Sequence, residues 1–228
     1  MARGNLSETA QARIRQLILD RKLGPGDPLP TESELCELLD MSRNSVREAL
    51  KALQAVRVIE IRHGFGTYVG SLSLDPLVDG IAFRAAVRHR RGEPSLYELM
   101  ELREALESGV IATVAATVPA DDLDVLDGLV RRMEREADEG AVDAATDRAF
   151  HLALYRSLGN HLLSEVLDAF WAAMRQVRDD LADDHQDPHR TCAQHAEIVA
   201  ALRAGDGARA AEAMRRHFDG IRKRLPAA

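Results

Sequence analysis

Four residues in the second half of the chain have the side-chain types and spacing of a divalent metal site. Asp147 and His151 are four residues apart, so on a helix both side chains project from the face that also carries Phe150. His195 and His217 each fall on the apolar stripe of a further predicted helix. Burying such groups is costly unless each is hydrogen-bonded or bound to a cation. Three imidazoles and one carboxylate suit Zn²⁺, Ni²⁺, Co²⁺, Mn²⁺ or Fe²⁺.

Two other interpretations of these residues stay open at this point. Each histidine taken singly could be a core or interface residue whose ring nitrogens are hydrogen-bonded. A metal held by three histidines and a carboxylate could also activate a water molecule, as in a metal-dependent hydrolase. That class lacks an evident general base here, because no HExxH motif occurs and Leu152 follows His151.

A further candidate is Arg103, a cation on a predicted apolar stripe. Its neighbours on that stripe include Leu99, Leu106 and Val110. A guanidinium in such a place requires an anion, and its planar fork matches a carboxylate. The anion could be a bound organic acid, Glu107 four residues further on, or a carboxylate from another helix.

A different chemistry is indicated near the amino terminus, where residues 42 to 55 predict a short helix with two unlike faces. Ser42 can cap this helix, and Thr31 with Glu34 forms a capping box that opens the helix before it. One face is apolar, with Val46, Ala49, Leu50 and Leu53. The opposite face is polar, with Arg43, Asn44, Ser45, Arg47 and Lys51. Such a face offers donors to base edges and phosphates in a major groove.

A β-hairpin is expected directly after this helix. Val58, Ile59 and Ile61 favour one strand, and Thr67 to Val69 favour its partner. Between them lie His63, Gly64, Phe65 and Gly66, and two glycines let the tip approach DNA closely. Together the segments predict a winged helix-turn-helix.

Residues 7 to 70 resemble the amino-terminal domain of the GntR family of bacterial transcription regulators. The likeness rests on Pro30-Thr31-Glu32, Ser42-Arg43, the run from Val46 to Leu50, and the Gly64-x-Gly66-Thr67 motif. It implies DNA contacts from the start of the recognition helix and from the wing tip, namely Arg43, Asn44, Ser45, Arg47, His63 and Gly64. Many members carry an arginine at the position of Ser33, so we expect the contacts of this chain with its operator half-site to differ there.

The second half resembles the FCD domain, the helical effector-binding module of the FadR subfamily of the same family. The D-x-x-F-H run that ends at His151 and the later His195 and His217 match its metal ligands, so the likeness implies a metal at Asp147, His151, His195 and His217. An E-L-R-x-x-L-E pattern spans Glu101 to Glu107, and it implies that Arg103 grips the carboxylate of a small organic acid near that metal.

The elements that position these residues predict a mainly α protein of two domains. Residues 1–72 form the winged helix-turn-helix, with three helices and a hairpin wing, and residues 73–228 form an all-α antiparallel bundle of six or seven helices. The bundle helices are expected at about 75 to 90, 95 to 116, 120 to 138, 142 to 158, 161 to 183, 188 to 204 and 206 to 224. We expect Asn160 to cap a helix.

Composition favours a cytoplasmic protein. Neither a signal peptide nor an apolar run of 18 residues occurs, so we expect neither secretion nor a membrane span. Cys36 and Cys192 form no CxxC motif and suggest no disulfide framework, which indicates a reducing compartment. The formal net charge is −7. Residues 1 to 73 hold 10 Lys and Arg against 9 Asp and Glu, so the acidity belongs to the second domain, and DNA binding requires only that the positive groups share one face.

The sequence therefore predicts a homodimeric, ligand-responsive DNA-binding regulator that is not an enzyme. It is expected to be a repressor that reads a palindromic operator, with binding modulated by a small organic or sugar acid near a divalent metal, most simply Zn²⁺. A metal-responsive regulator without an organic effector is the main alternative, and a metal-dependent hydrolase is a remote one.

Overall fold

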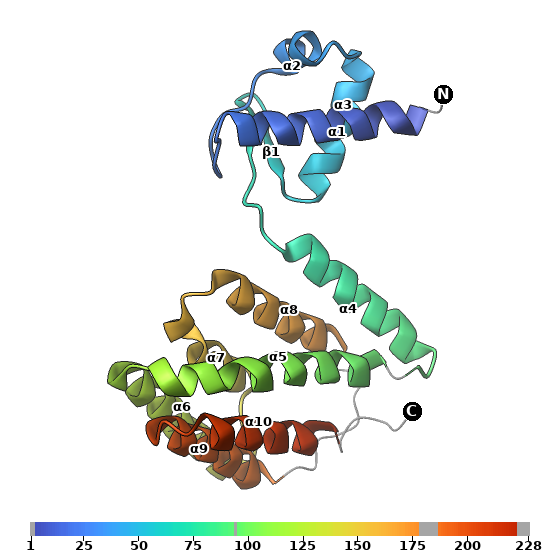
Figure 1. Ribbon diagram of the computed structural model, residues 1–228. Coiled ribbons are helices and arrows are strands. Elements are labelled where there is room, and N and C mark those ends of the chain that lie inside the picture. Colours follow the sequence, from blue (N-terminus) through green and yellow to red (C-terminus); the bar gives the residue numbers. More distant parts are fainter. Residues whose placement is uncertain (1–2, 94, 178–186, 223–228) are drawn as a thin grey trace. The chain divides into compact units, whose positions relative to one another are not determined.

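A computed structural model describes residues 3–93, 95–177 and 187–222 of the chain. It divides the chain into two compact units, Met1–Pro76 and Leu77–Ala228 (Figure 1). Each has its own hydrophobic core. The units are mainly helical, and the expected fold class is confirmed.

The first unit is a winged helix-turn-helix. Its elements are α1 (Arg3–Asp20), α2 (Glu32–Leu39), α3 (Arg43–Ala55), β1 (Ile59–Arg62) and β2 (Gly66–Val69). The strands pair antiparallel, with Ile59 opposite Val69 and Arg62 opposite Gly66. The apolar stripe predicted for α3 is buried as expected, and it packs with residues of α1, α2 and the hairpin, including Ile14, Leu35, Ile59 and Val69.

Side-chain caps set where the two central helices of this unit begin. The Thr31 backbone N–H donates to the Glu34 carboxylate at 2.7 Å, and the Glu34 N–H donates to Thr31 Oγ1 at 3.4 Å, which completes the predicted capping box. Ser42 Oγ accepts from the Ser45 N–H at 3.2 Å at the start of α3. The polar first turn of α3 therefore has a fixed starting point.

The second unit contains seven α-helices and one short 3-10 turn among its described residues. The elements are α4 (Asp75–Arg90), α5 (Ser95–Thr117), α6 (Ala120–Asp138), α7 (Ala144–Leu154), η1 (Arg156–Leu158), α8 (His161–Val177), α9 (Pro188–Arg203) and α10 (Gly207–Arg222). Two predicted helix ends, over 178–183 and 223–224, lie outside the described residues. No helix in the part of the chain that the structure describes is long and apolar enough to cross a membrane.

The helix predicted over about 142 to 158 is wrong in its last turn. The α-helix α7 ends at Leu154, and a 3-10 turn follows. The reason is Tyr155, which is buried with its hydroxyl donating to the Glu107 carboxylate at 3.1 Å, so the chain turns there to place the ring in the core. Gly159, with φ +61°, ends the turn, and Asn160 Oδ1 accepts from the Leu163 N–H at 3.1 Å, as the predicted cap of α8.

The helices α5 and α10 pack antiparallel against each other (Figure 1). Their backbones approach closely at Gly207, where an added Cβ would lie 3.1 Å from the Ala112 carbonyl oxygen. Further along, Arg222 forms an ion pair with Glu104. The two helices contribute Arg103 and His217, and α7 and α9 contribute the other predicted metal ligands.

Candidate functional site

The four predicted metal ligands come together inside the second unit. Asp147 and His151 come from α7, His195 from α9 and His217 from α10. One potential ligand atom from each residue lies within 4.8 Å of those of the others. All three imidazoles are buried, and the Asp147 side chain is 22% exposed. The structure thus brings together residues that are up to 70 positions apart in the sequence.

Nitrogen and oxygen atoms face one another at the centre of this cluster. His151 Nε2 lies 3.2 Å from His217 Nε2 and 3.7 Å from Asp147 Oδ1. His195 Nε2 lies 2.8 Å from Asp147 Oδ1, but the contact does not have the geometry of a hydrogen bond. Asp147 Oδ1, His195 Nε2 and His217 Nδ1 are buried without a hydrogen-bond partner. Such groups cost free energy unless something binds them.

Outer contacts orient two of the imidazoles. His195 Nδ1 lies 2.8 Å from the Thr191 carbonyl oxygen, and His151 Nδ1 lies 2.6 Å from Glu107 Oε2. Both partners are acceptors, so each Nδ1 carries the proton and each Nε2 presents a lone pair to the cluster centre. A carbonyl or carboxylate behind a ligating imidazole is the usual arrangement at protein metal sites.

The electrostatics of the cluster favour the protonation states that bind metals. Burial lowers the pKa of His151 and, more strongly, that of His217, so these imidazoles are neutral. Neutral imidazoles and an ionised carboxylate form a donor set that fits a borderline divalent cation.

Arg103 lies beside this cluster on α5 and is almost fully buried. Its Nε donates to Glu107 Oε1 at 2.6 Å, so the pairing that the sequence offered as one alternative is formed. The guanidinium also faces two aromatic rings, with its central carbon 4.3 Å from the Trp171 centroid and 5.2 Å from that of Phe218. Arg103 Nη2 remains buried without a partner.

Glu107 connects Arg103 to the cluster, and the sequence interpretation missed this second role. One oxygen accepts from Arg103 and the other accepts from His151 and from the Tyr155 hydroxyl. Burial acts to raise the pKa of Glu107, but His151 and Arg103 lower it to about 2. Glu107 had a sequence signal only as a possible partner of Arg103. Trp171, which stacks on Arg103, had none beyond being the single tryptophan.

The predicted DNA-contacting residues lie at two places on the first unit. Arg43, Asn44 and Arg47 are exposed in the first turns of α3, while Ser45 is half-buried. Arg47 Nε donates to Glu32 Oε2 of α2 at 2.9 Å, a contact that the sequence interpretation did not foresee. His63 and Gly64 are exposed between β1 and β2, with Gly64 at φ +81°.

Local contacts hold the wing in shape. The Tyr68 hydroxyl donates to the Phe65 carbonyl at 3.0 Å, and Arg62 stacks on the Tyr68 ring with its central carbon 4.3 Å from the centroid. The Phe65 side chain itself is 80% exposed. The tip is thus an ordered, exposed turn of a kind that can enter a groove.

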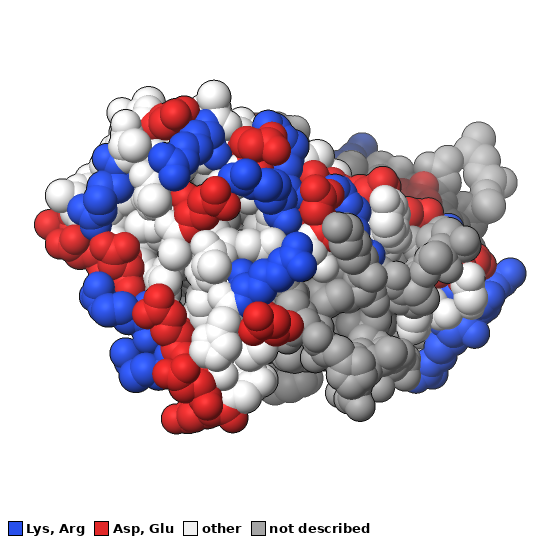
Figure 2. All heavy atoms as spheres, turned by 90° about the horizontal axis from the view of Figure 1, so that it is seen from below, with Lys and Arg blue, Asp and Glu red and all other residues white. Residues whose placement is uncertain are grey.

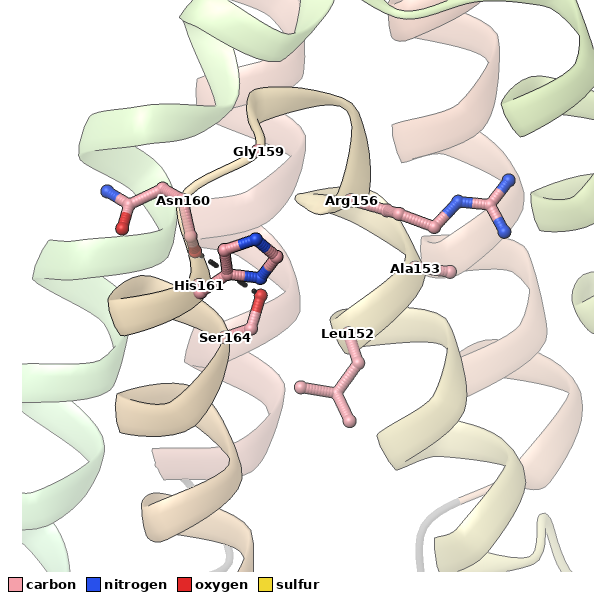
Figure 3. Close-up of a pocket in the computed structure, with 7 residues that line it drawn as sticks. All are labelled: Leu152, Ala153, Arg156, Gly159, Asn160, His161 and Ser164. Atoms are coloured by element: carbon pink, nitrogen blue, oxygen red, sulfur yellow. Dashed lines mark hydrogen bonds between the residues drawn. The ribbon is translucent and has the colours of Figure 1, made fainter. Parts of the chain in front are cut away.

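A surface hollow of about 270 Å³ lies between α7 and the start of α8, away from the cluster ligands. Figure 3 shows Leu152, His161 and Ser164 beside it. Ser164 Oγ donates to the Asn160 carbonyl, Asn160 Oδ1 caps α8, and Arg156 pairs with Asp122. Since these polar groups already have partners, the hollow is a weaker candidate for a ligand site than Arg103 and the cluster.

The outer surface of the second unit carries charges of both signs. Figure 2 views the molecule from the side on which α9 and α10 lie in Figure 1, and basic and acidic side chains lie next to one another there. Ion pairs between charged side chains of α6, α9 and α10 include Arg203 with Asp127 at 2.6 Å and Arg216 with Glu197 at 2.7 Å. Such a mixed surface does not favour DNA, which attracts patches of positive charge.

Comparison with known proteins gives two family matches, one for each part of the chain. Residues 6–69 match the family described as bacterial regulatory proteins, gntR family, and residues 98–220 match the FCD domain. The two matches cover the winged helix and the cluster region.

Individual relatives match along almost the whole chain. The chain is 31% identical to the HTH-type transcriptional regulator LutR of Bacillus subtilis over 90% of this chain and 94% of that protein. It is 30% identical to the Uxu operon transcriptional regulator of Escherichia coli K12, over 94% of this chain and 84% of that one. The HTH-type transcriptional repressor NanR of the same organism is 28% identical, over 97% and 84%. A solved GntR structure from Streptococcus agalactiae superposes with a TM-score of 0.67 at 28% identity, covering 95% of this chain and 99% of that one.

Proposed function

Because the chain belongs to the GntR family of bacterial regulatory proteins and carries an FCD domain, we propose that it is a metal-containing repressor whose DNA binding responds to a small carboxylate. It is a DNA-binding transcription regulator and not an enzyme, since both families and the relatives are regulators. A repressor is supported by the description of one relative, NanR, as a repressor.

One observation carries the proposal of a metal and a carboxylate. The buried Arg103 Nη2 has no partner, and Arg103 is joined through Glu107 to His151 of the cluster. In this proposal Asp147, His151, His195 and His217 hold the cation, which is most simply Zn²⁺. A bound cation with open coordination positions supplies a Lewis acid that attracts an anionic ligand. Arg103 supplies the second charge, so that an organic acid is held at two points.

The proposed DNA contacts are Arg43, Asn44, Ser45 and Arg47 for the major groove and the hairpin turn with His63 and Gly64 as the wing. Their exposure on α3 and on the tip of the hairpin supports this assignment. The operator is proposed to be a palindrome, because a two-fold dimer presents two identical recognition helices.

A homodimer is supported by apolar side chains that the second unit leaves exposed. Phe83 and Val87 lie four residues apart on α4 and are 71% and 41% exposed. A second copy of the chain would remove this surface from water. We place the dimer in the cytoplasm, where the bacterial chromosome lies. Sedimentation should give a dimer for the wild type and a monomer for Phe83→Asp if α4 forms the contact.

Regulation requires the acid to bind the DNA-competent and DNA-free states with different affinities. The proposal is tested by the thermal stability of metal-loaded protein against a panel of small carboxylates and sugar acids, with a chelated control. A ligand at about 100 times its Kd adds about 2.7 kcal/mol. A selective, metal-dependent increase in Tm, together with altered operator binding, supports the proposal. A response to metal alone would replace it with the metal-responsive regulator.

A further inference from the structure

Trp171 lies where the arginine and the metal cluster meet. It comes from α8, and its ring stacks on the Arg103 guanidinium, 4.3 Å from the central carbon. The same indole lies 5.9 Å, centroid to centroid, from the His151 ring. One aromatic side chain is therefore in contact with the proposed carboxylate anchor and adjacent to a proposed metal ligand.

Trp171 Nε1 is a buried donor without an acceptor, as is Arg103 Nη2. Within the described residues, seven buried side-chain polar atoms lack a partner, and five belong to Trp171, Arg103 and the cluster. The other two are the hydroxyls of Ser108 and Ser157. Folded proteins rarely leave buried donors unpaired, so their concentration in one place indicates a missing polar ligand.

The chemistry of the unpaired atoms restricts this ligand. An indole N–H and a guanidinium N–H only donate, so each requires an acceptor atom. A cation bound by the cluster uses the free carboxylate oxygen and imidazole lone pairs, but it cannot pair with either donor. Arg103 is also fixed in orientation, because its Nε is held by Glu107 and its faces lie against Trp171 and Phe218.

We propose that Trp171 Nε1 and Arg103 Nη2 are two donors of one subsite, and that Trp171 selects carboxylates with a second oxygen acceptor on the neighbouring carbon. The ligand class is a 2-hydroxy or 2-oxo acid, whose carboxylate pairs with Arg103 and whose second oxygen accepts from the indole. This inference rests on the proposed carboxylate effector and deepens it. A site built to bond an oxygen rejects the analogue that lacks it, because the buried donor is then left unpaired.

Trp171 supplies its own readout, since it is the single tryptophan of the chain. Full-length metal-loaded protein is titrated with three matched pairs, glycolate and acetate, malate and succinate, and 2-hydroxybutyrate and butyrate. We expect a saturable change in indole fluorescence and a preference of about tenfold or more for the hydroxy member of at least one pair, the ratio that one hydrogen bond supplies. Calorimetry gives the same affinities without a fluorophore.

The decisive variant is Trp171→Phe, which keeps an aromatic face on Arg103 but removes the donor. We expect its preference for the hydroxy acid to fall by about tenfold while the affinity for the deoxy acid and the metal content stay unchanged. Tyr97→Phe, which alters an exposed aromatic residue on α5, is the matched control and should keep the preference.

The outcomes separate the subsite from the proposed function. One outcome is that the wild type binds the hydroxy acids while Trp171→Phe keeps the full preference for the hydroxy over the deoxy acid. In that case the metal or another group binds the second oxygen, and the role of Trp171 is overturned. If metal-loaded wild type binds no acid of any pair while it retains metal, the carboxylate effector fails and the subsite fails with it. A Trp171→Phe protein that loses its metal overturns the subsite in favour of a structural role.

Discussion

Glu32 at the start of α2 accepts a hydrogen bond from Arg47 of α3 at 2.9 Å. The carboxylate engages Nε and leaves the two terminal nitrogens of the guanidinium for other partners. Both side chains reach the surface, with 60% of Arg47 and 30% of Glu32 exposed. The pair ties the orientation of a proposed base-reading arginine to the neighbouring helix.

The first prediction concerns this pair. Glu32→Gln removes a negative charge next to the proposed DNA surface and weakens the hold on Arg47, so affinity for unrelated DNA should rise while discrimination between operator and mutant sites falls. If Arg47 reads a guanine, Arg47→Ala should cost about 1–3 kcal/mol of preference at that base. Fluorescence anisotropy with both DNAs at two salt concentrations measures these effects. Unchanged discrimination in both variants would remove the pair from the reading surface.

Removal of one proposed ligand tests the cluster. His217→Ala should lower metal affinity by more than about 100-fold, beyond the 10–100-fold typical of an outer contact. His189→Ala is the control, because His189 is on α9 but is 60% exposed and outside the cluster. Metal content by atomic emission and Tm with and without chelator are the measurements. Equal metal content in the two variants would contradict a four-ligand site.

Glu107→Gln probes the contact behind His151. The amide preserves the shape but loses the charge that pairs with Arg103, so metal affinity should fall by about 10–100-fold. Tyr155→Phe should have a smaller effect, since it leaves the contacts of Glu107 with Arg103 and His151 in place. Competition with a chromophoric chelator gives both affinities. A larger loss in Tyr155→Phe than in Glu107→Gln would show that Glu107 does not orient the ligand.

Arg103→Lys tests whether the positive charge alone is sufficient at this position or whether the planar, two-donor geometry of the guanidinium is also required. The lysine keeps a positive charge beside Glu107 but cannot offer paired donors, so carboxylate affinity should fall by about tenfold or more while metal content is retained. Calorimetry with metal-loaded protein measures both. If metal binding is lost and acid binding is not, Arg103 is a structural partner of Glu107.

Stability of the amino-terminal unit should depend on pH through Glu34. Hydrogen bonds from Thr31 hold the pKa of Glu34 below its ordinary value of 4.5. A lowered folded pKa gives stability that is fully present above the unfolded value and is lost as pH falls through the folded one. The protection of α2 amides against hydrogen exchange, relative to the intrinsic rate at each pH, should therefore fall below about pH 4.5 more in the wild type than in Glu34→Gln, measured in chelated protein. Parallel pH profiles would show that the cap carries no ionic contribution.

Sequence periodicity was sufficient to place Asp147 and His151 on one helix face and to locate most of the helices. Asp147 and His151 share one helix, where a spacing of four places them on one face, and the apolar stripe of α3 is buried as predicted. Capping residues located the starts of α2 and α3 for the same local reason. These inferences use only the geometry of a single helix, which a sequence carries directly.

Contacts between helices could not be predicted in this way. Glu107 and His151 are 44 residues apart and Glu32 and Arg47 are 15 apart, so their pairing depends on how helices pack. The early end of α7 has the same origin, because Tyr155 leaves the helix to reach Glu107. The spacing of residues around Trp171 could not indicate its contact with Arg103, because Arg103 belongs to another helix, α5.

Gly207 marks a point about which the angle between α5 and α10 can change. Its close approach to Ala112 leaves no space for a Cβ at position 207. Arg103 lies nine residues before Ala112 and His217 ten after Gly207, which places both about 14–15 Å along the antiparallel pair. Any change in the angle between α5 and α10 at this contact would therefore displace Arg103 and His217 relative to each other, and the ion pair between Glu104 and Arg222 opposes such a change.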